Sequence, residues 1–282
     1  MMNKALDEFI NNALKEDIGD GDHTSLACIP DDNKGKARLL AKEEGILAGV
    51  RIAPLVFHKI DQDINLDIYL KDGSVIRPGD VVLIVEGRIR ALLQAERTVL
   101  NIMQRMSGIA TITRRYADEV KGLKTRVLDT RKTTPGMRML EKEAVRIGGG
   151  VNHRMGLYDM ILIKDNHIDF AGGIREAIER SRAYLERTGK SLKIEIEARS
   201  LEDVRRILET GGVDRILLDN FTPANTKIAV QMIGNKVETE SSGGITLEDL
   251  RKYAECGVDY ISVGALTHHI NSLDLSLDAI DF

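Results

Sequence analysis

The 282-residue sequence contains only two cysteines and no apolar run long enough to cross a membrane. Cys28 and Cys256 stand far apart, and their spacing offers neither a disulfide framework nor a structural zinc site. A membrane helix needs ~18 consecutive apolar residues, and acidic residues interrupt the apolar positions of residues 1–17, unlike in a signal peptide. We therefore expect a soluble protein in a reducing compartment, the cytoplasm.

The chain also lacks internal repeats, low-complexity linkers and an excess of basic residues. Its 40 Lys and Arg and 44 Asp and Glu give a net charge of -4, whereas a nucleic-acid binder usually spreads positive charge over a broad face. One stretch, residues 129–169, nevertheless concentrates cationic side chains at predicted turns. They are Arg131, Lys132, His153, Arg154, Lys164 and His167. This local convergence on an acidic protein indicates a pocket for a small polyanion.

The carboxy-terminal half alternates short apolar runs with amphipathic helices, several of which begin at a Ser or Thr cap and end at Gly. The runs are residues 126–129, 160–164, 193–198, 215–219, 236–241 and 260–264. The alternation predicts parallel strands that close into a TIM-like α/β barrel, with an open doubly wound sheet as the alternative.

The amino-terminal third has a different pattern. Residues 36–50 and 64–87 predict antiparallel strands joined by Asp-Gly and Pro-Gly turns. An amphipathic helix is expected over 91–107, and after Gly108 a second helix continues to about residue 120. This part forms a separate α+β layer.

We therefore expect two domains, an amino-terminal sandwich over residues 1–108 and a catalytic barrel over 109–271. The tail, 272–282, alternates leucines and predicts a strand. We expect this strand to fold back onto the amino-terminal domain.

In such a barrel the active site lies at the carboxyl ends of the strands. Residues 241–246 follow the penultimate strand, and residues 263–269 follow the last. Loops at these two positions often bind phosphate through backbone N–H groups, and glycine lets the backbone approach an anion closely. Gly-Gly alone would indicate a plain turn, but its place beside Gly264 and His268 favours a phosphate site.

Glu197 and Asp219 each end an apolar strand, where a charged side chain needs a partner. One interpretation is a buried salt bridge to a barrel lysine or arginine. The other is a site for ribose hydroxyls and Mg²⁺, which takes one or two carboxylates plus substrate oxygens. Glu195 is expected on the opposite face of its strand, with a structural role.

Lys164 allows three interpretations: a salt-bridged core lysine, a ligand of phosphate or carboxylate, or a Schiff-base nucleophile. The neighbouring cations favour the anion ligand. Arg131 and Arg154 suit bidentate capture of planar carboxylates. His153, beside Arg154 in a Gly-rich loop, has no metal-ligand spacing.

Long segments of the chain now resemble a known family. DTRKTTPGMRMLEKEAVRIGGGVNHRMGLYDMILIKDNHI, IEIEA, ILLDNF, ETESSGGIT and DYISVGALTHH occur in the order and spacing of quinolinate phosphoribosyltransferase, also called nicotinate-nucleotide pyrophosphorylase (carboxylating). EDIGDGDHTS and QAERTVLNIMQRMSGIAT are also similar to that family, so the resemblance covers nearly the whole chain.

The resemblance implies a pentosyltransferase that condenses quinolinate with phosphoribosyl pyrophosphate (PRPP) in the presence of Mg²⁺. The products would be nicotinate mononucleotide, pyrophosphate and CO2, in de novo NAD biosynthesis. It also implies an amino-terminal α/β sandwich, an incomplete α/β barrel of about seven strands, and a head-to-tail homodimer or a higher homo-oligomer, with no nucleic-acid or membrane partner.

The resemblance further implies roles for individual residues. Lys132, Lys164, Glu197 and Asp219 would be catalytic, and Glu197 and Asp219 would hold the ribose hydroxyls and the metal. The quinolinate pocket would comprise Arg131, Lys132, His153, Arg154 and Lys164, with Arg97 inserted from the partner subunit. The 5-phosphate would lie against Ser242, Gly243, Gly244, Gly264 and His268.

Other functions stay open on the residues alone. A relative linked to molybdenum transport shares part of the pattern, although the full set of arginines and lysines argues against it. A Schiff-base carbon–carbon lyase would use Lys164, and a non-catalytic phosphate-binding barrel would leave Glu197 and Asp219 without purpose.

Overall fold

The computed structural model describes residues 2–280, which form two compact units. The first unit comprises the residues up to Arg114, the segment 134–149 and the residues from His269 onward; the second comprises 115–133 and 150–268. The two-domain boundary expected after residue 108 stays a prediction. Within residues 2–280, no helix combines the length and the apolar character needed to cross a membrane.

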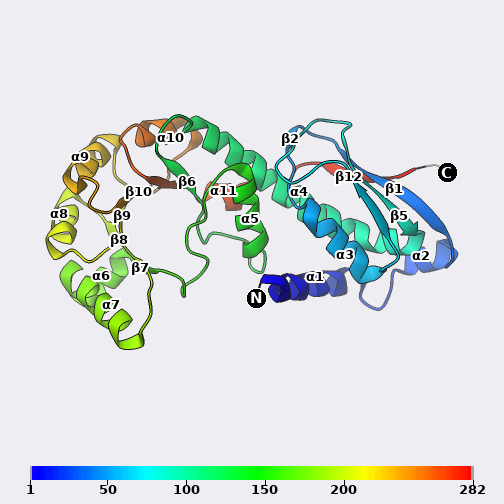
Figure 1. The fold of residues 1–282 in the computed structure, drawn as a ribbon, viewed down its shortest axis with the longest axis horizontal. Helices are drawn as coiled ribbons and strands as arrows, with labels where there is room; N and C mark the ends of the chain where they lie inside the picture. The colour runs from blue at the N-terminus through cyan, green and yellow to red at the C-terminus, as the bar shows by residue number, and fades with distance from the viewer. Residues whose placement is uncertain (1, 281–282) are drawn as a thin grey trace. The chain divides into compact units, whose positions relative to one another are not determined.

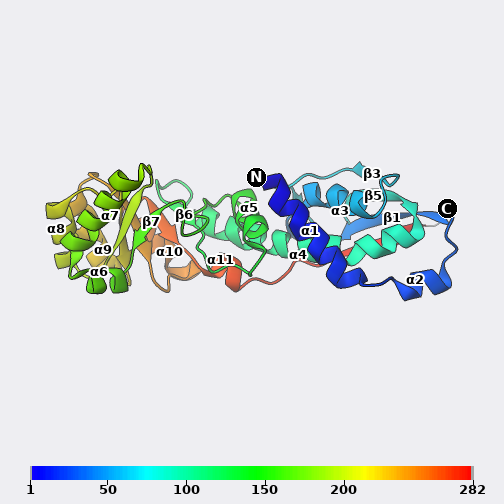
Figure 2. The same ribbon diagram turned by 90° about the horizontal axis from the view of Figure 1, so that it is seen from below.

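The first unit contains a four-stranded antiparallel sheet in the order β12-β1-β5-β3 (β12, β1 and β5 are labelled in Figure 1, and β3 in Figure 2). The sheet strands are β1 (Lys34–Ala41), β3 (Asn65–Ile68), β5 (Val81–Arg88) and β12 (Leu275–Ile280), and a short pair joins β2 (Gly45–Ile46) to β4 (Val75–Ile76). The helices are α1 (Met2–Ile18), α2 (His23–Cys28), the 3-10 turn η1 (Val50–Ile52), α3 (Ala53–Ile60), most of α4 (Ile89–Glu119) and α5 (Arg138–Gly148).

The core of this unit is apolar, as alternation along the strands predicts. β1 alternates exposed and buried residues over its first half, the pattern of a strand with one face in the core. Leu39 and Leu83 of the sheet are fully buried, as are Phe57 of α3 and Met103 and Met106 of α4. Burial of such side chains supplies most of the stabilisation of a small layer.

Helix α4 differs from the prediction of two helices separated at Gly108. It is one continuous helix (Figures 1 and 2), because Gly108 permits a close chain approach and does not break the helix. A Cβ on residue 108 would lie 2.2 Å from the backbone oxygen of Asn271. Next to this point, the Leu273 N–H donates to the Gln104 carbonyl at 3.0 Å, and Gln104 Nε2 donates to the Leu275 carbonyl at 2.8 Å.

The second unit is built on a six-stranded parallel sheet in the order β6-β11-β10-β9-β8-β7. The strands are β6 (Arg126–Leu128), β7 (Ile161–Ile163), β8 (Ile194–Ala198), β9 (Arg215–Asp219), β10 (Glu238–Ser242) and β11 (Tyr260–Ser262). Its helices are α6 (Asp165–Ala171), α7 (Ile174–Thr188), α8 (Leu201–Thr210), α9 (Pro223–Ile233), α10 (Leu247–Ala254) and α11 (Ala265–His268). Figure 1 shows α7 to α10 along the outside of the curved sheet.

A seventh position extends this sheet, because Val151 forms an isolated parallel bridge with Leu128 of β6. The sheet therefore curls without closing, and residues 152–160 connect Val151 to β7. This arrangement confirms the predicted incomplete α/β barrel. In a complete barrel the eighth strand would remove both sheet edges.

The interior of the barrel carries charged residues where most barrels carry branched apolar ones. Strand register places Glu195 of β8 opposite Arg215 of β9, and Arg215 opposite Glu238 of β10. Side chains two residues apart share a face, so Glu195 and Glu197 both point inward. The prediction that Glu195 faces away from Glu197 was wrong.

We predict that Gly108→Ala destabilises the first unit by about 1–3 kcal/mol, because the added methyl group would press against the Asn271 carbonyl. Asn101→Ala is the matched control, since Asn101 is exposed on the same helix and alanine favours helix there. Urea unfolding measures both variants. Equal stability of Gly108→Ala and the wild type would contradict the close approach.

Candidate functional site

Charged residues and glycines gather at the carboxyl ends of the parallel strands, which meet at one edge of the barrel. All of them belong to the second unit. They are Arg131 and Lys132 after β6, Lys164 after β7, Glu197 in β8, Asp219 at the end of β9, Ser242 to Gly244 at the end of β10, and Gly264 after β11. We call this edge the mouth.

Lys164 and Glu197 form the central ion pair of the mouth. Lys164 Nζ lies 2.6 Å from Glu197 Oε1, and the Asp165 N–H donates to Glu197 Oε2 at 3.2 Å. The Glu197 side chain is only 8% exposed, whereas that of Lys164 is 48% exposed. The carboxylate is thus fixed by donors on both oxygens, while the ammonium group reaches into solvent.

Asp219 lies near Glu197 and has a perturbed acidity. Burial raises the pKa of Asp219, and the negative charge of Glu197 raises it further. Asn220 Nδ2 donates to Asp219 Oδ2 at 2.9 Å. Two carboxylates that destabilise each other's charge offer oxygen ligands to a hard divalent cation, so this donor set fits Mg²⁺.

The loop after β10 is glycine-rich because the chain passes very close to the loop after β9. Gly243 and Gly244 have φ values of 104° and 62°, in the region that favours glycine. A Cβ on residue 243 would lie 2.2 Å from Asn220 Oδ1. The Asn220 N–H donates to the Ser242 carbonyl at 2.9 Å, so the two strand ends are held together.

Gly264 is the third glycine of the mouth, and the side chains of Lys132 and His268 lie over its backbone. A Cβ on residue 264 would lie 2.8 Å from His268 Nε2 and 3.0 Å from Lys132 Cδ. Thr267 Oγ1 donates to the Lys132 carbonyl at 2.8 Å and fixes the loop that carries this lysine. Lys132, Gly264 and His268 therefore share one corner, as an anion site requires.

Arg154 is partly buried beside another arginine. Burial lowers the pKa of the Arg154 guanidinium, and the positive charge of Arg131 lowers it further. Arg154 Nη1 also donates to the Met160 carbonyl at 3.3 Å. Two adjacent guanidinium groups repel each other, and a bound dianion would remove this repulsion.

His153 points into the barrel interior. Its Nε2 lies 3.0 Å from Glu195 Oε2 and 3.6 Å from Glu240 Oε2, and its Nδ1 accepts the Arg154 N–H at 2.7 Å. Burial and the nearby charge of Glu195 raise the pKa of Glu240 to about 7. Arg215 Nη1 lies 2.9 Å from Glu240 Oε2 and is the main cation of this interior group.

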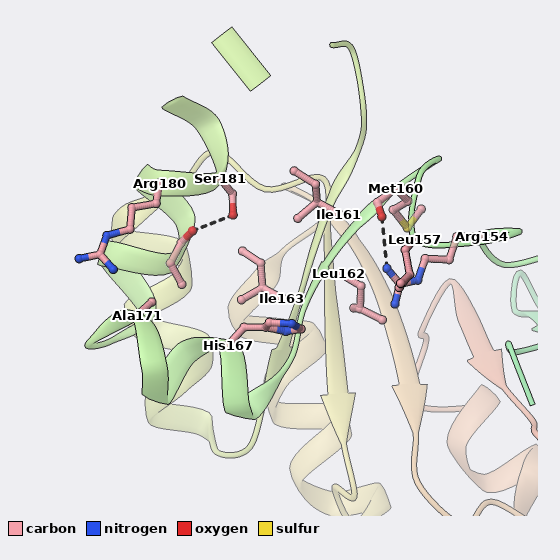
Figure 3. A pocket seen from close by; sticks show the side chains of 11 residues that line it. Arg154, Leu157, Met160, Ile161, Leu162, Ile163, His167, Ala171, Arg180 and Ser181 are labelled. Atoms are coloured by element: carbon pink, nitrogen blue, oxygen red, sulfur yellow. Dashed lines mark hydrogen bonds between the residues drawn. The ribbon is translucent and has the colours of Figure 1, made fainter. Parts of the chain in front are cut away.

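A pocket of about 370 Å³ flanks the edge strand β7 (Figure 3). Figure 3 shows Arg154 and Arg180 on opposite sides of this strand. Of the cationic residues predicted to form a polyanion pocket, Arg154 and His167 contribute to its lining, and Ile161 and Ile163 supply much of the rest. The pocket therefore adjoins the mouth, but we place the chemistry at the mouth because the paired charges lie there.

The structure thus groups the predicted residues into three sets: Lys164, Glu197 and Asp219; Lys132, Gly264 and His268; and Arg131 with Arg154. Arg97 is exposed on α4 in the first unit, so its proposed role in a partner's site stays a prediction.

Three interior residues were not predicted as part of the site: Glu195, Arg215 and Glu240. Their signal was present in the sequence, because each lies two or four residues before a predicted site residue on the same strand.

Two family models match the chain in succession. The amino-terminal domain of quinolinate phosphoribosyl transferase matches residues 22–107, and the carboxy-terminal domain matches residues 109–278. Together they cover most of the sequence.

Curated relatives and solved structures agree with these models. The chain is 44% identical to the mitochondrial quinolinate phosphoribosyltransferase (decarboxylating) 2 of Nicotiana glauca, over 96% of this chain and 81% of that protein. It is also 44% identical to the probable nicotinate-nucleotide pyrophosphorylase (carboxylating) of Bacillus subtilis, over 97% and 93%.

The crystal structure of NadC from Streptococcus pyogenes superposes with a TM-score of 0.92 at 37% identity, over 98% of this chain and 97% of that chain. The nicotinate-nucleotide pyrophosphorylase of Ehrlichia chaffeensis gives 0.91 at 40% identity, over 97% and 98%. The paired cations and carboxylates of the mouth thus lie on a fold and a sequence shared with these enzymes, and the chain belongs to the quinolinate phosphoribosyl transferase family.

Proposed function

We propose that this protein transfers the phosphoribosyl group of PRPP to quinolinate and releases CO2, which yields nicotinate mononucleotide and pyrophosphate for NAD biosynthesis. The relatives named above as decarboxylating or carboxylating enzymes support this assignment. One observation carries it: Arg154 is partly buried and its pKa is lowered by burial and by the charge of Arg131, on the unit that also presents Lys164, Glu197 and Asp219. This arrangement suits a dianion and a phosphorylated sugar together.

The cationic residues would hold quinolinate by its two carboxylates. The residues that we assign to this pocket are Arg131, Lys132, His153, Arg154 and Lys164, of which Lys132 and Lys164 would also reach PRPP. The ring of His153 accepts the Arg154 N–H, so this histidine would act through Arg154. Quinolinate and PRPP both carry negative charge, so they repel each other until cationic groups screen them in a site of low dielectric. Bidentate guanidinium groups also orient the ring, which brings its nitrogen toward the anomeric carbon.

The carboxylates would hold the sugar. Glu197 and Asp219 are placed to accept hydrogen bonds from the ribose hydroxyls and to hold Mg²⁺, which neutralises the pyrophosphate leaving group when bound. The backbone at Ser242, Gly243 and Gly244 would receive the 5-phosphate, together with Gly264 and His268. The positive φ values of Gly243 and Gly244 support this role, because they leave the backbone without side-chain cover.

The decarboxylation needs little from the protein. Once its nitrogen is alkylated, the ring is cationic and accepts the electron pair that the departing CO2 leaves on carbon. We therefore assign no general base and no covalent intermediate. The contact of Lys164 Nζ with Glu197 Oε1 at 2.6 Å supports an ion-pairing role for this lysine.

We further propose a homodimer in which Arg97 of one subunit completes the pocket of the other, and a cytoplasmic location. The exposed position of Arg97 on α4 is compatible with contact to a second subunit.

We predict that the protein converts quinolinate and PRPP to nicotinate mononucleotide in the presence of Mg²⁺, with release of CO2 and pyrophosphate. Carboxyl-labelled quinolinate followed by trapping of labelled CO2 measures the reaction. Nicotinate is the control substrate and should not react, because it lacks the second carboxylate. Turnover of nicotinate in place of quinolinate would contradict the substrate assignment.

We predict that Arg154→Ala loses about 2–5 kcal/mol of transition-state stabilisation for quinolinate, because a buried charge pair with the substrate is removed. Arg180→Ala is the matched control: Arg180 lines the same pocket beside β7 but belongs to α7, away from the mouth. Steady-state kcat/KM for quinolinate measures both. A near-normal value for Arg154→Ala would remove the proposed carboxylate site.

We predict that Arg97→Ala and Lys164→Ala, each inactive alone, recover about a quarter of the wild-type rate when their subunits are mixed at random, since half of the dimers then contain one intact site. Mixing Arg131→Ala with Lys164→Ala is the control and should recover nothing, because both residues belong to the same mouth. Mass spectrometry verifies the heterodimers. No recovery in verified heterodimers would contradict a site shared between subunits.

A further inference from the structure

A second charged group lies inside the barrel beneath the mouth. We call it the interior cluster and define it as His153, Glu195, Arg215 and Glu240. Glu195 is 0% exposed and Glu240 is 1% exposed. Within residues 2–280, neither oxygen of Glu195 accepts a well-aligned hydrogen bond, and the same is true of Glu240 Oε1. Two buried carboxylates with one guanidinium are costly, so stability alone does not account for them.

The interior cluster determines which nitrogen of the His153 ring carries the proton. Nδ1 accepts the Arg154 N–H at 2.7 Å and so carries no proton itself. The ring proton of neutral His153 therefore lies on Nε2, which faces Glu195 Oε2 at 3.0 Å and Glu240 Oε2 at 3.6 Å. Acidic partners at this nitrogen are what select one tautomer of an imidazole.

The same ring fixes the backbone that carries Arg154. The His153 N–H donates to Asp129 Oδ1 at 2.8 Å, and the next N–H, that of Arg154, donates to the His153 ring. Asp129 is fully buried at the end of β6. Residues 153 and 154 are thus held by two side-chain acceptors from inside the barrel, in a stretch of chain that belongs to no helix or strand.

Arg154 needs such support because its neighbour repels it. The guanidinium is partly buried near Arg131, and a loop free to move would carry it into solvent. A misplacement of about 1 Å in a substrate-positioning group can cost a hundredfold in rate. The position of the Arg154 backbone therefore controls how well the mouth holds a carboxylate.

We propose that Glu195 and Glu240 are positioning residues of the active site: they hold His153 as the Nε2–H tautomer, and His153 in turn holds the Arg154 backbone for quinolinate binding. This proposal rests on the proposed function. The two acids act through the histidine and do not touch substrate, and Arg215 neutralises Glu240 from the other side.

A metal ion is the competing occupant of this place. His153, Glu195 and Glu240 each offer one ligand atom, and these atoms lie within 4.8 Å of one another. However, Arg215 Nη1 already lies 2.9 Å from Glu240 Oε2 and is itself fixed by Glu238, with Nη2 3.1 Å from Glu238 Oε2. The cation that a metal would supply is thus provided by the guanidinium.

The kinetic experiment compares Glu195→Leu, which removes the acceptor facing Nε2, with Glu195→Gln, which keeps an acceptor oxygen. We expect Glu195→Leu to raise the KM for quinolinate about ten- to a hundredfold while the KM for PRPP stays within about twofold. Glu195→Gln should restore the KM for quinolinate to within about threefold of the wild type. Glu238→Gln is the matched control, since Glu238 contacts Arg215 but not His153, and its KM for quinolinate should not change.

An equal rise in both KM values for Glu195→Leu, or no rise in a folded variant, would overturn the positioning role. If the wild type does not use quinolinate, the proposed function fails and the kinetic comparison has no meaning. In that case the protonation site of the His153 ring can still be measured, and this measurement tests the interior cluster independently of activity.

Nitrogen NMR of histidine-labelled wild-type protein provides this measurement and needs no variant of the two acids; a folded His153→Gln protein serves only to assign the signal. We expect one imidazole, assigned by its loss in His153→Gln, with a proton on Nε2 and none on Nδ1. An Nδ1–H tautomer or an imidazolium ion would overturn the proposal. Stoichiometric metal in the purified wild type that disappears in Glu195→Gln would also overturn it, because a metal would then occupy the cluster.

Discussion

The barrel depends on one guanidinium group, that of Arg215, which is shared between Glu238 and Glu240 and lies 4.2 Å from the centre of the Tyr260 ring. Without it, the interior would contain buried carboxylates with no strong counter-charge, and burial of an unpaired charge is among the most destabilising features known in proteins. Its contacts span three neighbouring strands, so the guanidinium also fixes their relative register.

Charge pairing differs between the barrel interior, where Arg215 lies, and the mouth. In the interior, Arg215 is paired with Glu238 and Glu240. At the mouth, by contrast, the charge of Arg131 lowers the pKa of Arg154, and Lys164 is half exposed. The mouth therefore has positive charge available for polyanions, which the interior does not.

The fold was largely predictable from the sequence, because alternating strands and capped helices leave a clear periodic pattern. The family resemblance supplied the incomplete barrel, and the isolated bridge at Val151 bears it out. Long-range packing was not predictable. The sequence predicts a helix break at Gly108, because glycine weakens helices. The residue that requires glycine at position 108 is Asn271, which lies 163 positions further along the chain.

The site residues that lie at the ends of parallel strands could be predicted from the sequence. Glu197 and Asp219 end their strands, and Gly243, Gly244 and Gly264 follow theirs, so topology brings them to one edge. Glu195 was misassigned although the period of two places it on the face of Glu197. The contact between His153 and Glu195 joins a loop to strand β8, and no local sequence pattern connects the two.

The first unit is built from three separate stretches of chain, and its strand β1 pairs on one side with β12, residues 275–280. During synthesis on the ribosome, therefore, β1 must wait with one edge open until residues 275–280 have emerged. The barrel segment, which is made after β1, can complete its sheet before that point. Such an order exposes an unpaired strand edge in the nascent amino-terminal layer, which makes it a natural client for chaperones.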